Sequence, residues 1–268
     1  LTPGVPRVDF ETTVGNRARD HRLRVHFPVP VRAEVAHVEG HWDVVEWSPD
    51  LPTDTEGWAE QPSPTRPQRG WTSVSDGAWA LTVANRGLPE VEVIHAGAGL
   101  EIVLTLLRCV GWLSRGDLPC RPGHAGPALP TPEAQCLGQH TFRYALLLHE
   151  GDWRAAFAEA TAFQSDLRAV SLPARPGRLP PRLAFVQVDP QALQVSAVKP
   201  PEEGEGLIVR LWNVEDRPVE GAVRLWRTFA RAVQTDMGER EIRELARHTD
   251  VVRVSARGRE VITLRFSP

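Results

Sequence analysis

Two cysteine–histidine pairs carry the residue types of a metal site. Cys120 and His124 are separated by three residues, and the same spacing recurs at Cys136 and His140. Two thiolates and two imidazoles can hold zinc in a tetrahedral arrangement, with each ligand atom about 2.0–2.3 Å from the metal. The segment that starts at Cys136 reads as a strand, however, in which residues four apart lie about 13 Å from each other. We therefore predict no metal site and interpret these residues as ordinary thiols and loop histidines.

The chain also lacks the short motifs of common catalytic sites. No G-x-S-x-G, H-E-x-x-H, P-loop or G-x-G-x-x-G pattern occurs in it. A glycosidase needs a pair of carboxylates, but the spacing of the acidic residues selects no pair, so the sequence assigns no catalytic residue. The carboxylates considered were Asp43, Glu46, Glu90, Glu92, Asp117, Glu133 and Asp152.

Tryptophan is unusually frequent relative to tyrosine. The chain has nine tryptophans and one tyrosine. An indole ring offers a flat apolar face with a polar N–H group, which suits contact with a sugar. Four tryptophans lie in or near a Pro-, Thr- and Gly-rich loop predicted at residues 48–70, and they are the candidates for stacking on a carbohydrate: Trp42, Trp47, Trp58 and Trp71.

The elements that would position these residues are predominantly strands. Period-two alternation of apolar residues recurs at residues 23–27, 141–148, 193–197 and 262–266. Residues 100–107 are apolar enough for a strand buried on both faces. A helix is expected from residue 152 to about residue 167, with Asp152 as its N-cap, and a short polar helix at residues 238–247. The sequence therefore predicts an all-β chain with one or two helices.

Composition limits the classes of function and the number of domains that the chain can have. The 268 residues include 31 Lys+Arg and 34 Asp+Glu, a net charge of -3 that argues against a nucleic-acid binder. No apolar run reaches the length of about 18 residues that a membrane-spanning helix needs. Three cysteines are too few for a disulfide framework, which favours reduced thiols and a cytoplasmic location. A proline-rich, acid-free stretch at residues 171–182 predicts a linker, so we place two domains at residues 1–175 and 176–268.

Six stretches are more specific than these patterns. They are DHRLRVHFP (20–28), ANRGLPEVEV (84–93), LTLLRCVGWLSRGDL (104–118), TPEAQCLGQHTFRYALLLH (131–149), LQVSAVKPPEEGEGLIVRLWN (193–213) and REVITLRF (259–266). In content and order they resemble the C-terminal β-region of glycoside hydrolase family 38, the α-mannosidases. The resemblance implies a β-supersandwich like that of galactose mutarotase, incomplete at its N-terminus, followed by a smaller β-sandwich.

The same resemblance implies where the chemistry lies. Family members cleave α-mannosides with an aspartate nucleophile and a zinc ion in an N-terminal catalytic domain, and this chain has no counterpart of those residues. The resemblance therefore implies no catalytic or metal-ligating residue and no cofactor in this chain, with zinc in the absent catalytic domain. Some members receive an arginine from the β-region at the active-site rim. The resemblance does not single out one arginine here, and we nominate Arg115 and Arg121.

Three functions follow as hypotheses. The first is a non-catalytic segment that supports the catalytic domain and substrate cleft of an α-mannosidase-like hydrolase. Its expected partners are that domain, α-linked mannosides or related sugars, and a second copy of the chain. The second is an independent carbohydrate-binding β-sandwich module. The third is a mutarotase or epimerase that uses His140 or His149 with Glu90 as an acid–base pair. Only analogy with the fold of such enzymes supports it.

Overall fold

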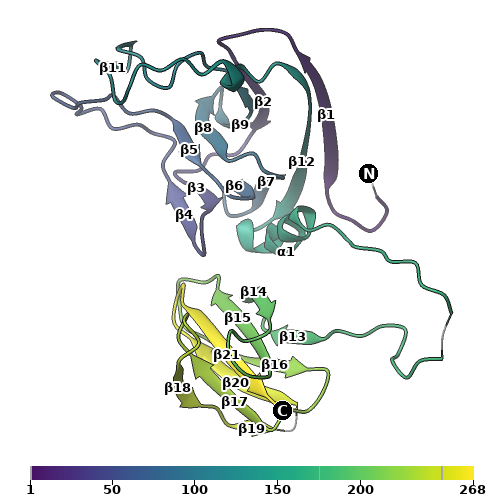
Figure 1. Ribbon diagram of the computed structural model, residues 1–268. Helices are drawn as coiled ribbons and strands as arrows, with labels where there is room; N and C mark the ends of the chain where they lie inside the picture. The colour runs from purple at the N-terminus through teal and green to yellow at the C-terminus, as the bar shows by residue number, and fades with distance from the viewer. Residues whose placement is uncertain (1, 175, 249) are drawn as a thin grey trace. The chain divides into compact units, whose positions relative to one another are not determined.

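The computed structural model describes residues 2–174, 176–248 and 250–268. It divides into two compact units, Leu1–Arg168 and Ala169–Pro268, each with its own sheets (Figure 1). Apart from Arg175, which lies outside the described residues, residues 169–185 contain no helix or strand. Arg175 is the last residue of the first predicted domain, so the predicted boundary itself stays a prediction.

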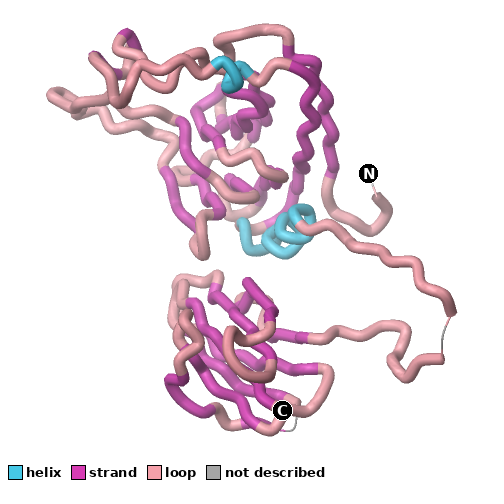
Figure 2. The backbone as a smooth tube through the Cα atoms, viewed as in Figure 1, coloured by secondary structure: helices cyan, strands magenta, loops and turns pink. Residues whose placement is uncertain are grey.

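The strands of the first unit, magenta in Figure 2, form two larger antiparallel sheets and one two-stranded ribbon. In spatial order, the six-stranded sheet consists of β1 (Val8–Asn16), β12 (Gly138–Glu150), β7 (Trp79–Asn85), β6 (Trp71–Ser75), β3 (Ala36–Glu39) and β4 (Val44–Trp47). The four-stranded sheet consists of β2 (Arg22–Val29), β9 (Gly99–Arg108), β8 (Glu90–Ala96) and β5 (Thr65–Pro67). The two-residue strands β10 (Asp117–Leu118) and β11 (Arg121–Pro122) form a small ribbon, and a 3-10 turn, η1 (Pro132–Gln135), precedes β12.

The core of this unit forms because alternate residues of both sheets face each other. Phe27 from β2, Ile102 and Leu104 from β9, and Tyr144 from β12 are buried in one cluster. The alternation predicted at residues 23–27 and 141–148 is confirmed, and β9 is the buried strand expected at residues 100–107. The other face of β2 carries Arg22, Arg24 and His26, which form part of the polar outer surface of the four-stranded sheet.

The one α-helix among the described residues, α1 (Trp153–Gln164), packs on strands β6, β7 and β12 of the six-stranded sheet (Figure 1). The Asp152 carboxylate caps it by accepting a hydrogen bond from the backbone N–H of Arg154 at 2.9 Å. Trp153 and Phe157 are buried on its inner face. The helix, its cap and this face are as the sequence predicts, although the helix ends three residues before Leu167.

The second unit is a smaller sandwich of two antiparallel sheets. The four-stranded sheet consists of β13 (Val186–Asp189), β16 (Val219–Leu225), β20 (Val251–Ala256) and β19 (Arg247–His248). The five-stranded sheet consists of β14 (Leu193–Lys199), β15 (Leu207–Asn213), β21 (Val261–Ser267), β17 (Arg231–Thr235) and β18 (Glu241–Glu244). Ile262, Leu264 and Phe266 of β21 are buried in its core. Together with the first unit, this sandwich confirms the predicted all-β class.

Three local predictions are wrong. Residues 241–244 form the edge strand β18 rather than a helix, because they pair with β17 in an antiparallel ladder, to which Arg231 adds ion pairs with Glu241 and Glu244. A bulge between Val195 and Ala197 interrupts the alternation of β14 and leaves Val195 exposed. The predicted loop at residues 48–70 contains strand β5, which pairs with β8.

A glycine in the second unit gives a stability prediction. A Cβ atom on Gly258 would overlap the backbone carbonyl of Asp216, which cannot move aside like the end of a flexible side chain. We expect Gly258→Ala to lower the free energy of unfolding by about 2 kcal/mol in urea denaturation. At Gly177 a Cβ would meet no atom within 4 Å, so Gly177→Ala is the matched control and should change stability by less than about 0.5 kcal/mol. Equal losses in the two variants would contradict the steric argument.

Candidate functional site

An open cavity of about 710 Å³ lies in the first unit where β2 begins and β9 ends. Arg22 lines it from β2, Arg108 from β9, and Glu60 from the loop that precedes β5. Asp20 and His21 line it from the segment just before β2, and most of the remaining lining comes from the loop that follows β9, including Trp112, Arg115 and Arg121. A volume of this size suits a small ligand.

The loop after β9 is held in place by backbone hydrogen bonds. The N–H of Val110 donates to Ala134 O at 3.2 Å, Leu113 to Leu129 O at 2.9 Å, and Thr131 to Gly111 O at 2.9 Å. The two arms of the loop therefore run beside each other. Within the loop, the Ser114 hydroxyl accepts hydrogen bonds from the backbone N–H groups of Ala125 at 3.1 Å and Gly126 at 3.2 Å. The long segment is thus an ordered wall of the cavity.

The loop that precedes β5 joins this wall. The backbone N–H of Gln61 donates to Cys120 O at 2.7 Å. The guanidinium of Arg121 donates from Nη1 to the Glu60 carboxylate at 3.2 Å. Trp58, two residues before Glu60, is half exposed. Trp58, predicted to stack on a sugar, and Arg121, predicted at the active-site rim, therefore lie on neighbouring loops that contact each other.

The other predicted rim arginine, Arg115, is engaged within its own turn. Its Nε and Nη2 donate to the two carboxylate oxygens of Asp117 at 2.9 and 2.6 Å. These hydrogen bonds lower the pKa of Asp117. Arg115 therefore lines the cavity as one member of an exposed, bidentate ion pair.

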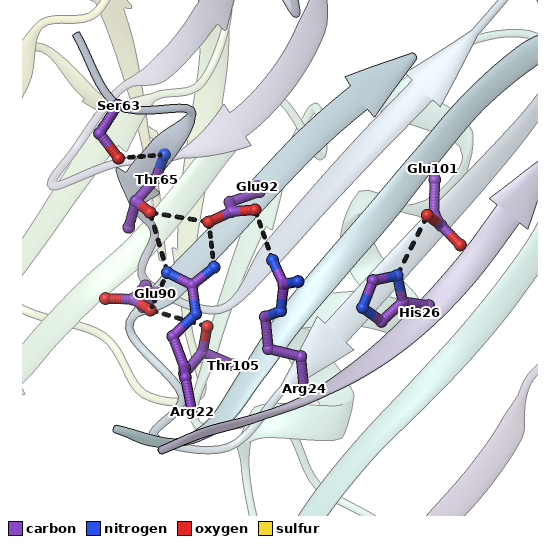
Figure 3. A network of polar contacts seen from close by, with 9 residues as sticks. All are labelled: Arg22, Arg24, His26, Ser63, Thr65, Glu90, Glu92, Glu101 and Thr105. Carbon is purple, nitrogen blue, oxygen red and sulfur yellow. Dashed lines mark hydrogen bonds and ion pairs between the residues drawn. The ribbon is translucent and has the colours of Figure 1, made fainter. Parts of the chain in front are cut away.

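A network of polar side chains covers the adjoining outer face of the four-stranded sheet (Figure 3). The side chain of Glu92 on β8 is only 5% exposed. It accepts hydrogen bonds from Arg22, from Arg24 at 2.8 Å and from Thr65 at 2.8 Å. Because β9 lies between β2 and β8, the two arginines reach across it to the carboxylate. Arg22 belongs to both the network and the cavity lining.

The protonation of Glu92 follows from two opposing effects. Burial by itself raises the pKa of this carboxyl, but the hydrogen bonds from Arg22 and Thr65 and the charges of Arg22 and Arg24 outweigh it, so the pKa is lowered. Glu92 is therefore the anion that balances two arginines. Beside it, Glu90 accepts a hydrogen bond from Thr105 at 2.7 Å and lies 3.5 Å from Arg22 Nη1.

The four nominated tryptophans differ in what they can contact. Trp71 is completely buried and stacks on Trp153 with ring centroids 5.6 Å apart, so its indole has no face for a sugar. We withdraw it as a candidate for this reason. Trp47 is partly buried with Arg66 over its ring at 5.7 Å, and Trp42 has its ring centroid 4.4 Å from that of His41. Together with Trp58, these two stay predictions.

The cysteines and histidines that suggested zinc each have other neighbours. His124 lies 3.4 Å from Ser114 Oγ, and His140 Nε2 lies 2.8 Å from the backbone carbonyl of Cys136. Cys120 is 4.0 Å from Glu60. Within residues 2–174, 176–248 and 250–268, no group of three or more His, Cys, Asp or Glu side chains is arranged to hold a metal ion.

The histidines proposed for a mutarotase-like reaction also have separate partners. His149 Nε2 lies 2.9 Å from the Thr82 hydroxyl on the six-stranded sheet, whereas Glu90 is bound to Thr105 on the four-stranded one. We therefore do not pursue this hypothesis.

Among the cavity residues that sequence reasoning missed are Arg108 and Trp112. Both lie in the stretch LTLLRCVGWLSRGDL (104–118), one of the six that carry the family resemblance. Arg108 is the last residue of the buried strand β9, and Trp112, which is 48% exposed, follows in the loop. An arginine at the end of an otherwise apolar strand and a tryptophan four residues later were the signals available.

Comparison with known proteins agrees with the resemblance. Residues 192–264 match the family described as "Glycosyl hydrolases family 38 C-terminal beta sandwich domain". A protein of Halalkalibacterium halodurans named "Putative mannosylglycerate hydrolase" is 29% identical over 268 residues, which are 99% of this chain and 28% of the relative. The chain therefore spans under a third of the length of this curated relative.

Two solved structures match along nearly the whole chain. An α-mannosidase from Enterococcus faecalis V583 has 29% identity and a TM-score of 0.79, covering 98% of this chain and 27% of that one. A protein in glycosyl hydrolase family 38, also from Enterococcus faecalis, has 28% identity and a TM-score of 0.77, covering 98% of this chain and 28% of that one.

Proposed function

Because this chain resembles the C-terminal β-region of glycoside hydrolase family 38 along nearly its whole length, we propose that it is a non-catalytic segment of an α-mannosidase-like hydrolase. In this role it associates with the catalytic domain and supports the substrate cleft. The observation that supports this proposal most directly is the extent of the match, which includes 99% of this chain but only 28% of the curated relative. The resemblance puts the nucleophile in the remaining part.

The cavity gives this proposal a location. Arg115 and Arg121 both line it and are our candidates for the rim of the substrate cleft. Trp58 on the neighbouring loop is the best exposed of the nominated tryptophans, with Trp42 and Trp47 as further candidates for contact with α-linked mannosides or related sugars. The two long loops thus carry the groups that would face a bound sugar.

The rest of the proposal concerns partners and setting. We expect zinc in the catalytic domain, because the resemblance implies that its ligands lie there. A homo-oligomer is a secondary expectation, and the proposed location is the cytoplasm. Among the described residues, no helix has both the length and the apolar character needed to span a bilayer.

A chimera tests the non-catalytic role. The region of the Enterococcus faecalis α-mannosidase that matches this chain would be replaced by residues 1–268, and hydrolysis of an aryl α-mannoside would be measured with zinc supplied. We expect no turnover by the chain alone, little by the enzyme lacking that region, and recovery of about tenfold or more in the chimera. Arg121→Gln should reduce the recovered rate, whereas Arg253→Gln, on β20 of the second unit, is the control. Turnover by the chain alone would overturn the proposal.

The alternative, an independent carbohydrate-binding module, is favoured by the half-exposed indoles of Trp58 and Trp112. Calorimetric titration of the chain with mannose and mannobiose distinguishes the two roles. Saturable heat with mannobiose would favour the module, and the absence of heat at millimolar sugar would remove it.

A further inference from the structure

Two of the three cysteines meet at the base of the loop that follows β9. Cys109 directly follows β9, and Cys136 lies between η1 and β12. The N–H of Val110 donates to Ala134 O at 3.2 Å, and the Cys136 thiol lies 3.6 Å from that same oxygen. Both cysteines are free thiols. The two ends of the loop therefore bring a pair of reduced sulfur atoms together.

A buried side chain at the end of β1, Asn16, links the two cysteines. Its Nδ2 donates to Cys109 Sγ at 3.5 Å and to the backbone oxygens of Gln135 at 3.1 Å and Cys136 at 2.8 Å. His140 Nε2 lies 2.8 Å from the same Cys136 oxygen. Cys136 has φ 49° and ψ 44°, a left-handed conformation that residues other than glycine seldom adopt. The hydrogen bonds to its carbonyl hold Cys136 in this conformation beside Cys109.

The two thiols differ in burial and in protonation. Cys109 is only 3% exposed. Burial raises the pKa of its thiol, and the adjacent Cys136 thiol, which hydrogen-bonds to it, raises that pKa further. Cys109 is therefore protonated at neutral pH. Cys136 is half-buried, so a small oxidant reaches its sulfur first.

We propose that Cys109 and Cys136 form a reversible disulfide that fastens the two ends of the loop after β9 when the protein meets a peroxide. The thiolate of Cys136 attacks one oxygen of hydrogen peroxide and breaks the O–O bond, which leaves a sulfenic acid on Cys136 and releases one water. The sulfur of Cys109 then attacks the sulfenic sulfur. The S–S bond forms, the S–O bond breaks and a second water leaves.

The balance of this step is complete. The two thiols lose two electrons and two protons, and the peroxide is reduced to two waters. His21 Nε2 lies 4.0 Å from Cys109 Sγ and is the base placed to accept the proton of this buried thiol. A cellular dithiol reopens the bond by thiol–disulfide exchange. The pair therefore stays open where thiols are kept reduced and closes on exposure to oxidant.

The disulfide would act on the ordered wall of the cavity. In the reduced chain, hydrogen bonds such as Val110 N–H to Ala134 O hold the ends of the loop together. A covalent link between the ends removes the conformations in which they separate. This inference goes beyond the proposed function and does not depend on it, because oxidation of the chain is followed without a sugar or a catalytic domain.

The test is treatment of the full chain with hydrogen peroxide, followed by peptide mapping under non-reducing conditions. Digestion with trypsin and a glutamate-specific protease puts each cysteine on its own peptide, because cleavage after Glu133 separates Cys136 from Cys120. We expect peptides 109–115 and 134–143 to be joined, with a loss of two hydrogen atoms, and dithiothreitol to separate them. Three free thiols, a link to Cys120, a disulfide between two chains, or a sulfinic acid on Cys136 without the link would overturn the proposal.

Variants assign the link to this pair. Cys136→Ser, at the half-buried position, should abolish the joined peptides. Cys120→Ser is the matched control, because the Cys120 thiol lies 4.0 Å from Glu60 on the neighbouring loop, and it should form the link as the wild-type chain does. Circular dichroism checks that both variants fold. Loss of the link in Cys120→Ser would refute the assignment.

Amide hydrogen exchange tests the effect on the loop. Residues 110–135 should exchange about tenfold more slowly in the oxidised chain than in the reduced one, and the second unit should be unchanged. Peroxide should not alter the exchange of this loop in Cys136→Ser. Equal exchange in the oxidised and reduced wild-type chains would show that the disulfide does not fasten the loop.

Discussion

Replacing Trp153 with alanine is expected to lower the free energy of unfolding of the first unit by about 4 kcal/mol, the middle of the range for truncating a large buried aromatic side chain. Trp153 begins α1, is 2% exposed, and stacks on Trp71 with centroids 5.6 Å apart. Phe157, one turn further along the helix, packs against both indoles at 6.0 Å. Alanine would leave a cavity beneath the helix and remove the anchor of its first turn.

Urea denaturation followed by circular dichroism would measure this loss. Trp79→Ala is the matched control, because Trp79 is also at the start of an element of the first unit, β7, but is 50% exposed. Its truncation should cost about 1 kcal/mol or less. If both substitutions lower the free energy of unfolding by the same amount, the aromatic cluster does not hold the helix in place.

Replacing Glu92 with alanine is expected to lower the free energy of unfolding by about 3 kcal/mol. The variant would leave Arg22 and Arg24, each about 30% exposed, without their shared counterion and with Arg108 still nearby. The same urea measurement applies. Glu11→Ala is the control, because the Glu11 side chain is 58% exposed and its ion pair with Arg143 lies on the surface; it should cost less than about 1 kcal/mol. A similar loss in both variants would show that burial of Glu92 contributes little.

The contribution of Glu92 should also depend on pH in a defined direction. Its pKa is lower in the folded chain than in the unfolded one. The ionised, paired carboxylate therefore stabilises the fold above the unfolded-state pKa, and this stabilisation is lost as the pH falls through the folded-state pKa. The difference between the wild-type chain and Glu92→Ala should be constant near neutral pH and shrink below about pH 4. A difference that grows in acid would contradict this sign.

The sequence alone predicted the elements whose signals are local. Leu23, Val25 and Phe27 alternate within one strand, and Asp152 lies directly before the helix that it caps, so neighbouring residues suffice to predict both. The same local signal failed at residues 241–244, where cross-strand ion pairs to Arg231 hold a short polar segment extended. Arg231 is ten or more residues from Glu241 and Glu244 in the chain. A prediction from neighbouring residues therefore could not take this strand pairing into account.

The candidate site depended on residues far apart in the chain. That Arg115 and Arg121 share a cavity with Arg108 and Trp112 required the path of the loop after β9, and that Trp71 is buried required the position of α1. Glu92 and Arg22 are 70 residues apart and meet only because β9 lies between their strands in a given register. The sequence by itself determined the all-β class, the helix that follows Asp152 and the resemblance to a known β-region, because alternation, capping and motif order are properties of contiguous residues. Only the tertiary structure decided which charges are paired, because strand order and register bring distant side chains together.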